Sequence, residues 1–259
     1  RGGGLVPTMG ARHEVGLARV KRAGANSDIV AVSVFVNPAQ FGPNEDFSRY
    51  PRTLEEDCRK CEQAQVDLVF APSANEMYPD GFDSWVDVRG LTDVLEGESR
   101  PGHFRGVTTV CAKLFNIVRP ENACFGKKDY QQLKVIQKMV RDLNMPLKIV
   151  PIETLREPDG LAMSSRNRYL SSEERRAALV LSSALQQARD AYESGERCAV
   201  TIQDTVSKLV TAEPLANIDY SVVVDAETLR PIERVENPAV VLLAVRIGST
   251  RLIDNMELG

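Results

Sequence analysis

The stretch "VPTMGARHEVGLARV" (residues 6–20) predicts a strand, a tight turn and a helix in direct succession. Leu5 and Val6 end a short apolar strand, and an apolar pattern with helical spacing begins straight after His13. In doubly wound sheets, such a turn lies where free backbone N–H groups meet anionic ligands. Gly10 would let the backbone approach a phosphate, and His13 could donate a hydrogen bond to it. The alternative is an ordinary strand-to-helix turn with a solvent-exposed histidine.

Strands and helices are predicted to alternate over the first two thirds of the chain. The β-branched run "IVAVSVFV" (residues 29–36) indicates a buried strand, and Thr53 and Glu56 form a possible capping box at the start of a helix. Further strands are predicted at 66–72, 122–126 and 147–152, and helices at 53–65, 107–118 and 129–143. This alternation favours an α/β fold, a Rossmann-like doubly wound parallel sheet with helices on both faces.

The pattern changes after about residue 168. Ser171 and Glu174 form a second capping-box pattern, which predicts a long helix that ends near Ser194. A helix at 202–212 and strands at 218–224, 239–247 and 250–255 are predicted to follow. We therefore expect two domains, residues 1–168 and a smaller C-terminal α+β domain at residues 169–259.

Composition excludes several classes of protein. A hydrophobic content of 43% with 26% charged residues is typical of a soluble globular protein, and a net charge of −4 favours no nucleic-acid partner. The longest apolar run, residues 29–36, is far shorter than the roughly 20 residues that span a bilayer. No secretory signal is recognisable, so a cytoplasmic protein without a membrane partner is expected. Five cysteines do not form a disulfide framework, although Cys58 and Cys61 leave a zinc or redox CxxC site as an alternative.

Two segments place polar side chains beside predicted strand ends. In "FVNPAQFGPNEDFSRYPRT" (residues 35–53), the amides of Asn37 and Gln40 suit a hydroxy acid or a carboxylate, although Asn-Pro is also good turn chemistry. In "FGKKDYQQL" (residues 125–133), Lys128 and Asp129 lie at a strand-to-helix junction, and Gln132 follows one turn later. The alternative for these lysines is an ordinary solvated surface.

A third segment, "DGLAMSSRNRYL" (residues 159–170), offers two hydroxyls and an arginine between the expected domains. A guanidinium pairs with phosphate oxygens in a fork, so a pyrophosphate clamp is one interpretation and a polar linker is the other. Two common motifs are absent from the sequence. Gly126 and Lys127 are not part of a GxxxxGK[ST] loop, and Leu17 stands where HExxH needs its second histidine. No metal bound by protein ligands is expected.

The order of these strings resembles the pantothenate synthetase family over nearly the whole chain. The strings are "PTMG..HE", "FVNPxQFGPNEDFxRYPRT", "LVFAPS", "RPGHFRGV", "CFGxKDYQQL", "SSRNxYL" and "RLIDN". The resemblance implies a ligase that joins pantoate to β-alanine with ATP and Mg²⁺, through a pantoyl-adenylate intermediate, and releases AMP and pyrophosphate. It also implies a homodimer, a first domain that binds the nucleotide and pantoate, and a C-terminal lid domain.

The resemblance carries roles to individual residues. Gln40 and Gln132 match pantoate-binding glutamines, Gln40 also lies where β-alanine enters, and Lys128 matches a lysine that contacts phosphate. Leu155 is expected to offer backbone groups to adenine. The implied catalytic residues are His13, Lys128, Ser164, Ser165 and Arg166, with Gly16 at the position of a proton-donating histidine. The implied ATP-binding residues are Met9, Gly10, Ala11, Arg12, His13, Glu14, Val15, Gly16, Gly126, Lys127, Lys128, Asp129, Leu155, Met163, Ser164, Ser165 and Arg166.

Two positions depart from the family pattern. Family members usually read "HEGH" or "HDGH" where this chain reads "HEVG", so the second histidine is Gly16, and Lys127 stands where glutamate is usual. Loss of one preorganised donor typically slows a reaction about 10²- to 10³-fold, so a weakened adenylation step is expected. The alternative function is a dimeric relative that binds ATP and pantoate but turns over little.

Overall fold

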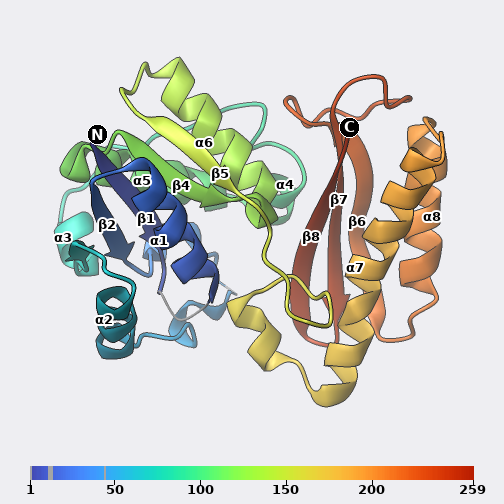
Figure 1. Ribbon diagram of the computed structural model, residues 1–259, viewed down its shortest axis with the longest axis horizontal. Helices are drawn as coiled ribbons and strands as arrows, with labels where there is room; N and C mark the ends of the chain where they lie inside the picture. The colour runs from blue at the N-terminus through green and yellow to red at the C-terminus, as the bar shows by residue number, and fades with distance from the viewer. Residues whose placement is uncertain (1, 11–13, 44) are drawn as a thin grey trace. The chain divides into compact units, whose positions relative to one another are not determined.

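A computed structural model describes residues 2–10, 14–43 and 45–259 of the chain. The backbone forms two compact units (Figure 1). Unit 1 comprises Arg1–Lys127 and Gln131–Glu153, and unit 2 comprises Lys128–Tyr130 and Thr154–Gly259. The segment from Thr154 to Arg168 thus groups with unit 2, where Leu161 packs in the hydrophobic core and Arg156 pairs with Asp254. The division lies before the boundary that the sequence predicts after residue 168.

Unit 1 contains a five-stranded parallel sheet in the order β3-β2-β1-β4-β5. The predicted doubly wound sheet is therefore confirmed, and its strand order reverses between β1 and β4. In such sheets ligands bind at this switch point, outside the carboxyl ends of the strands. The strands are β1 (Gly3–Thr8), β2 (Ile29–Val34), β3 (Leu68–Phe70), β4 (Asn122–Gly126) and β5 (Lys148–Ile152).

Helices cover both faces of this sheet, because successive strand residues point to opposite sides. Leu5 and its neighbours on one face pack against α5 and α6, and Val6 on the other face packs against α1 and α2. The helices of this part of the chain are α1 (Glu14–Asn26), α2 (Leu54–Gln63), α3 (Ala74–Met77), α4 (Glu96–Ser99), α5 (His103–Val118) and α6 (Tyr130–Asp142). Single 3₁₀ turns are η1 (Pro38–Gln40), η2 (Asp46–Ser48) and η3 (Lys127–Asp129).

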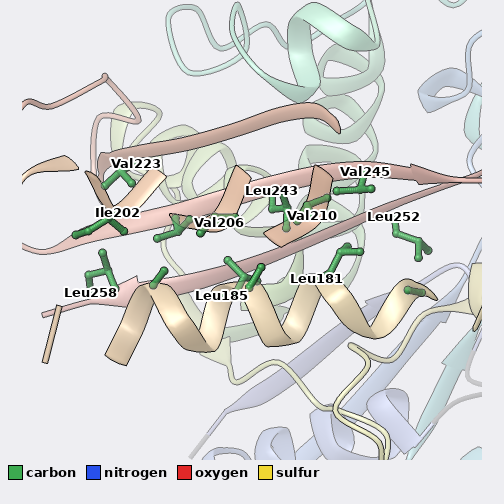
Figure 2. Packing of buried hydrophobic residues seen from close by; sticks show 14 of the residues in the cluster. Leu181, Leu185, Ile202, Val206, Val210, Val223, Leu243, Val245, Leu252 and Leu258 are labelled. Atoms are coloured by element: carbon green, nitrogen blue, oxygen red, sulfur yellow. The ribbon is translucent and has the colours of Figure 1, made fainter. Parts of the chain in front are cut away.

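Unit 2 contains a three-stranded antiparallel sheet in the order β6-β7-β8. The strands are β6 (Ala216–Asp225), β7 (Ala239–Ile247) and β8 (Thr250–Leu258). Helices α7 (Ser172–Glu193) and α8 (Ala199–Thr211) lie along one face of this sheet, after the 3₁₀ turn η4 (Ser165–Tyr169). Their apolar side chains, Leu185 and Val206 among them, interdigitate with those of the strands to form the core of the unit (Figure 2). The predicted C-terminal α+β architecture is confirmed.

One of the two predicted capping boxes forms. Ser171 accepts a hydrogen bond from the backbone N–H of Glu174, whose carboxylate accepts one from the backbone N–H of Ser171. The box at Thr53 was predicted wrongly, because the Thr53 side chain makes no capping hydrogen bond. Its ψ of 53° takes the residue out of the extended conformation that an N-cap side chain needs.

None of the helices within the described residues combines the length and the apolar character that crossing a membrane requires.

Candidate active site

The turn after β1 begins with an unusual backbone conformation. Gly10 has a φ of +152°, which favours glycine, and its N–H donates to the hydroxyl of Thr8 at 2.6 Å. Ala11, Arg12 and His13, to which the resemblance assigns ATP contacts, lie outside the described residues. Glu14 and Val15 open helix α1, and Gly16 lies within its first turn. The described residues on either side thus belong to a strand and to a helix, in the predicted order.

The turn η1, directly after β2, is built around Asn37. The Asn37 Oδ1 accepts hydrogen bonds from the N–H of Ala39 at 3.2 Å and from the Tyr78 hydroxyl at 2.8 Å. Its Nδ2 donates to the carbonyl of Gly106 at 3.0 Å and to Gln40 Oε1 at 3.2 Å. These four bonds use the two donors and two acceptor positions of an amide. Asn37 therefore stabilises the turn η1, as the Asn-Pro pattern suggests, and also supports the Gln40 side chain.

Gln40 is held close to the end of β1. Its side chain is buried, with 9% of the residue exposed, and its Nε2 donates to the sulfur of Met9 at 3.2 Å. Two residues that the sequence assigns to the site, Met9 and Gln40, therefore come together at the carboxyl ends of the neighbouring strands β1 and β2.

A group that the sequence analysis missed fixes the backbone of Gln40. The Nδ1 of His103 lies 2.8 Å from the Gln40 carbonyl oxygen, and the Nε2 of His103 lies 3.0 Å from NH1 of Arg100. Arg100 also pairs through two nitrogens with the carboxylate of Glu45, at 2.6 and 2.7 Å. Burial, and then the adjacent Arg100 charge, lower the pKa of His103 to about 4. The string "RPGHFRGV" carries these residues, but it contributes only to the family resemblance.

At the carboxyl end of β4, the space beside Gly126 is occupied by the mobile end of a long side chain. A Cβ placed there would overlap the guanidinium of Arg19, which reaches this point from α1. The adjacent Lys127 forms an ion pair with Glu153 at 2.8 Å, just after the end of β5. Its charge is therefore partly balanced within unit 1.

Two adjacent glutamines at the start of α6 have different environments. Gln131 is buried, and its amide binds the carbonyls of Leu91 and Val94 and the N–H of Glu96, so it is structural. Gln132 is half-buried, and its side chain makes no hydrogen bond within the described part of the chain. Of the two amides, Gln132 is the one available to a ligand.

Unit 2 contains the remaining candidates. The N–H of Met163 donates to the carbonyl of Leu155 at 2.9 Å, so two residues assigned to the nucleotide lie next to each other. The hydroxyl of Ser164 caps η4 by accepting the N–H of Arg166 at 3.2 Å. Lys128 belongs to the same unit, and its side chain is largely buried, with its Nζ 4.0 Å from Oδ1 of Asp129.

The CxxC alternative gains no support. Cys58 is exposed, Cys61 is buried with a pKa raised by that burial, and both are free thiols. Among the residues that the structure describes, no group of three or more His, Cys, Asp or Glu side chains could hold a metal ion.

Known proteins match the chain along its whole length. The family described as pantoate-beta-alanine ligase matches residues 1–257. Pantothenate synthetase from Moorella thermoacetica is 55% identical over 255 residues, which cover 98% of this chain and 90% of that protein. The crystal structure of pantothenate synthetase from Thermus thermophilus has a TM-score of 0.97 at 48% identity, covering 100% of this chain and 94% of that one.

A further solved structure holds ligands. Pantoate-beta-alanine ligase from Francisella tularensis, complexed with beta-gamma ATP and beta-alanine, has a TM-score of 0.80 at 35% identity and covers 99% of this chain and 89% of that one. The expectation that Gly16 weakens the enzyme is not borne out by these matches, which include the region of Gly16. The chain therefore belongs to the pantoate–β-alanine ligase family, the ATP-dependent ligases called pantothenate synthetases.

Proposed function

We propose that this ligase works in two steps at the carboxyl edge of the parallel sheet. A carboxylate oxygen of pantoate attacks the α-phosphorus of ATP, and the bond to the β-phosphate breaks, which gives pantoyl adenylate and pyrophosphate. The amine of β-alanine then attacks the acyl carbon, loses a proton and displaces AMP, which gives pantothenate. The observation that carries this proposal is the meeting of Met9 and Gln40 beside the point where the strand order reverses.

The nucleotide is proposed to lie along the ends of β1 and β4. Gly10 and Gly126 have no side chains, so a phosphate or ribose could approach the backbone closely at both positions. His13, Lys128, Ser164, Ser165 and Arg166 are proposed to neutralise and orient the phosphates. The remaining ATP contacts are proposed for Met9, Ala11, Arg12, Glu14, Val15, Gly16, Lys127, Asp129, Leu155 and Met163, largely through backbone groups.

Pantoate is proposed to bind between the amides of Gln40 and Gln132. Gln40 is held on its backbone and on its side chain, and the amide of Gln132 is available. Asn37, whose own amide is fully engaged, contributes by orienting Gln40. Rigid placement of this kind lowers the barrier by holding the carboxylate near the α-phosphorus.

Mg²⁺ is proposed to enter with ATP as part of the substrate. Mg²⁺ is commonly held by substrate phosphates and only one or two carboxylates. When bound, it would neutralise phosphate charge.

A cytoplasmic homodimer is also proposed, on the family resemblance alone. Residues 1–168 are proposed to bind the nucleotide and pantoate, and residues 169–259 to act as the lid. Size-exclusion chromatography with light scattering measures the assembly directly. A mass near the chain's 28.6 kDa, instead of twice that value, would contradict the dimer.

Exchange of labelled pyrophosphate into ATP tests the two-step reaction. We expect exchange that requires pantoate and proceeds without β-alanine, and AMP release as pantothenate that requires both. Gln132→Ala should raise the KM for pantoate by about tenfold, because it removes a hydrogen bond to a charged group. Gln186→Ala, an exposed amide on α7, is the matched control and should leave the KM unchanged. Exchange with another hydroxy acid and none with pantoate would refute the substrate.

A further inference from the structure

Two consecutive residues of β8, Asp254 and Asn255, bond to both segments that the proposed function assigns to the phosphates. Both are buried, with 3% and 7% of the residue exposed. They belong to the string "RLIDN", to which neither the sequence analysis nor the proposed reaction assigns a role. All the contacts described below lie within unit 2.

Asn255 holds the backbone of Lys128. Its Nδ2 donates to the Lys128 carbonyl oxygen at 2.8 Å, although the two residues lie far apart in sequence. The hydroxyl of Tyr130 donates to the carbonyl of Ala226 at 3.2 Å and fixes the next turn of the same segment. The point from which the Lys128 side chain extends is thus set by side-chain contacts on both sides.

Asp254 holds the segment that leads to Met163 and Arg166. Its two oxygens accept hydrogen bonds from NH1 and NH2 of Arg156, at 2.7 and 3.0 Å. This paired geometry is the strong, directional form of an Arg–carboxylate contact. The Arg156 NH1 also donates to the carbonyl of Gly160 at 3.1 Å. One guanidinium therefore joins β8 to the loop of residues 155–163.

The two ends of this loop are hydrogen-bonded to each other immediately before Ser164, Ser165 and Arg166. Arg156 and Ala162 form an isolated antiparallel bridge, and the N–H of Met163 reaches the carbonyl of Leu155. Asn167, just beyond, donates to Glu157 Oε1 at 2.7 Å and to the carbonyl of Ala162 at 3.1 Å. The loop is therefore bonded at its start and end, and Arg156 connects it to Asp254.

The two anchors are also bonded to each other. The backbone N–H of Asn255 donates to Asp254 Oδ1 at 2.8 Å, so the carboxylate accepts from both Arg156 and its own neighbour. The Asn255 side chain thus holds the Lys128 segment and the Asp254 side chain holds the loop that leads to Arg166. Neighbouring residues of one strand therefore attach both segments that carry the cations.

We propose that Asp254 and Asn255 are positioning residues for the nucleotide phosphates, which act by fixing Lys128 and Arg166 so that both cations meet one triphosphate. This proposal rests on the phosphate roles given under the proposed function. Preorganised cations stabilise charge in the transition state, and a misplacement of about 1 Å can cost about 10²-fold in rate.

The test replaces each anchor by a residue of the same shape. Asn255→Asp cannot donate to the Lys128 carbonyl, and Asp254→Asn cannot pair both oxygens with Arg156. We expect pantoate-dependent pyrophosphate exchange to slow by about 10- to 100-fold, or the KM for ATP to rise by that factor, while the KM for pantoate stays within about twofold. The matched control is Asp219→Asn. Asp219 lies on β6, and this change removes its ion pair with Arg251 of β8, where the two side chains are 2.6 Å apart.

The outcomes separate this proposal from the proposed function. A merely structural role would lower the unfolding temperature of the variants and leave the KM for ATP and the exchange rate at wild-type values, which would overturn the proposal. Equal losses in Asp219→Asn would overturn it as well. Absence of pantoate-dependent exchange in the wild type would instead refute the proposed function. If either variant fails to fold by circular dichroism, Asn255→Ser and Arg156→Lys give the same comparison with smaller changes.

Discussion

The Nδ1 of His103 and the backbone oxygen of Gln40 lie 2.8 Å apart, and this contact fixes the protonation state of a buried histidine. A carbonyl oxygen only accepts, so Nδ1 must carry the proton. On the other side of the ring, Arg100 only donates, so Nε2 must keep its lone pair. His103 is therefore neutral, in a single tautomer, and its ring joins Arg100 to the turn that presents Gln40.

Two replacements of His103 separate its two nitrogens. The amide nitrogen of asparagine lies near the position of Nδ1, and that of glutamine lies near Nε2. His103→Asn keeps a donor for the Gln40 carbonyl, so its KM for pantoate should stay within about threefold of the wild type. His103→Gln removes the 2.8 Å contact and leaves that carbonyl with only the long contact from Arg100 NH2, at 3.5 Å. The loss of a buried hydrogen bond costs about 1 kcal/mol or more and should raise the KM about tenfold.

Steady-state kinetics with pantoate varied at saturating ATP and β-alanine measure this difference. Arg105→Ala, which removes an exposed cation on the same helix, is the control. Equal KM values in the asparagine and glutamine variants would contradict the proposed contact with Gln40.

The same histidine makes stability depend on pH in a defined window. Its pKa is about 4 in the folded protein against an ordinary value of 6.5, because burial and Arg100 oppose protonation, while Glu45 and Glu96 weakly favour it. Between these two values the unfolded chain binds more protons than the folded one, so stability falls as the pH falls. A shift of this size corresponds to a loss on the order of 3 kcal/mol between pH 7 and pH 4.

Urea denaturation at pH 7, 5.5 and 4.5 measures this loss. The fall in the free energy of unfolding should be clearly smaller in His103→Asn, which has no imidazole at this position. Carboxylates that do not interact with His103, such as Glu76, whose pKa is lowered by its hydrogen bonds with Ser73, titrate in both proteins and cancel in the comparison. Parallel pH dependences for the two proteins would show that His103 is not the group responsible.

Strands with clear ends could be predicted from the sequence, and long-range polar contacts could not. The predicted strands 122–126 and 239–247 match β4 and β7, because apolar runs there stop at polar or glycine residues. The start of α5 was predicted too late, since its first turn carries His103 and Arg105 and has no apolar pattern. Local spacing carries no information about which distant backbone group a side chain will reach.

In the candidate site too, individual residues could be predicted from the sequence, but the contacts between them could not. Gln40 and Met9 could be assigned from strings near strand ends, but their contact depends on the order of strands in the sheet. Asn37 looked like a ligand for substrate, although its hydrogen bonds are used within η1 and its neighbours. Asn255 reaches Lys128 only because β8 folds against that segment.

The core of unit 2 should be sensitive to loss of a single leucine. Leu185 of α7 is fully buried among Ile202, Val206 and Leu243 in one continuous cluster. Leu185→Ala should destabilise the protein by about 2–5 kcal/mol, because the lost contacts leave a cavity. Val200→Ala on α8, where the side chain is 60% exposed, should change stability by less than about 0.5 kcal/mol. Urea titration followed by far-UV circular dichroism gives both values, and similar midpoints for the two variants would contradict this packing.

Helix α5 passes so close to η1 that only glycine fits at position 106. A Cβ on Gly106 would overlap the backbone carbonyl of Ala39 and crowd the N–H of Gln40, and backbone atoms cannot move aside as a flexible side chain can. Gly106→Ala should therefore shift η1, raise the KM for pantoate by about 10- to 100-fold and cost roughly 1–3 kcal/mol of stability. The carbonyl of Gly106, which accepts from Asn37, would be displaced at the same time.

Gly24→Ala provides the matched control for this change. Gly24 lies in α1, and a Cβ there would lie 3.8 Å from the Val30 side chain, an ordinary van der Waals contact. Alanine is a better helix former than glycine, so this variant should keep wild-type kinetics and gain up to about 1 kcal/mol of stability. Thermal unfolding and pantoate kinetics of both variants decide the matter. If Gly106→Ala binds pantoate as well as Gly24→Ala does, the close packing of α5 on η1 does not control the position of Gln40.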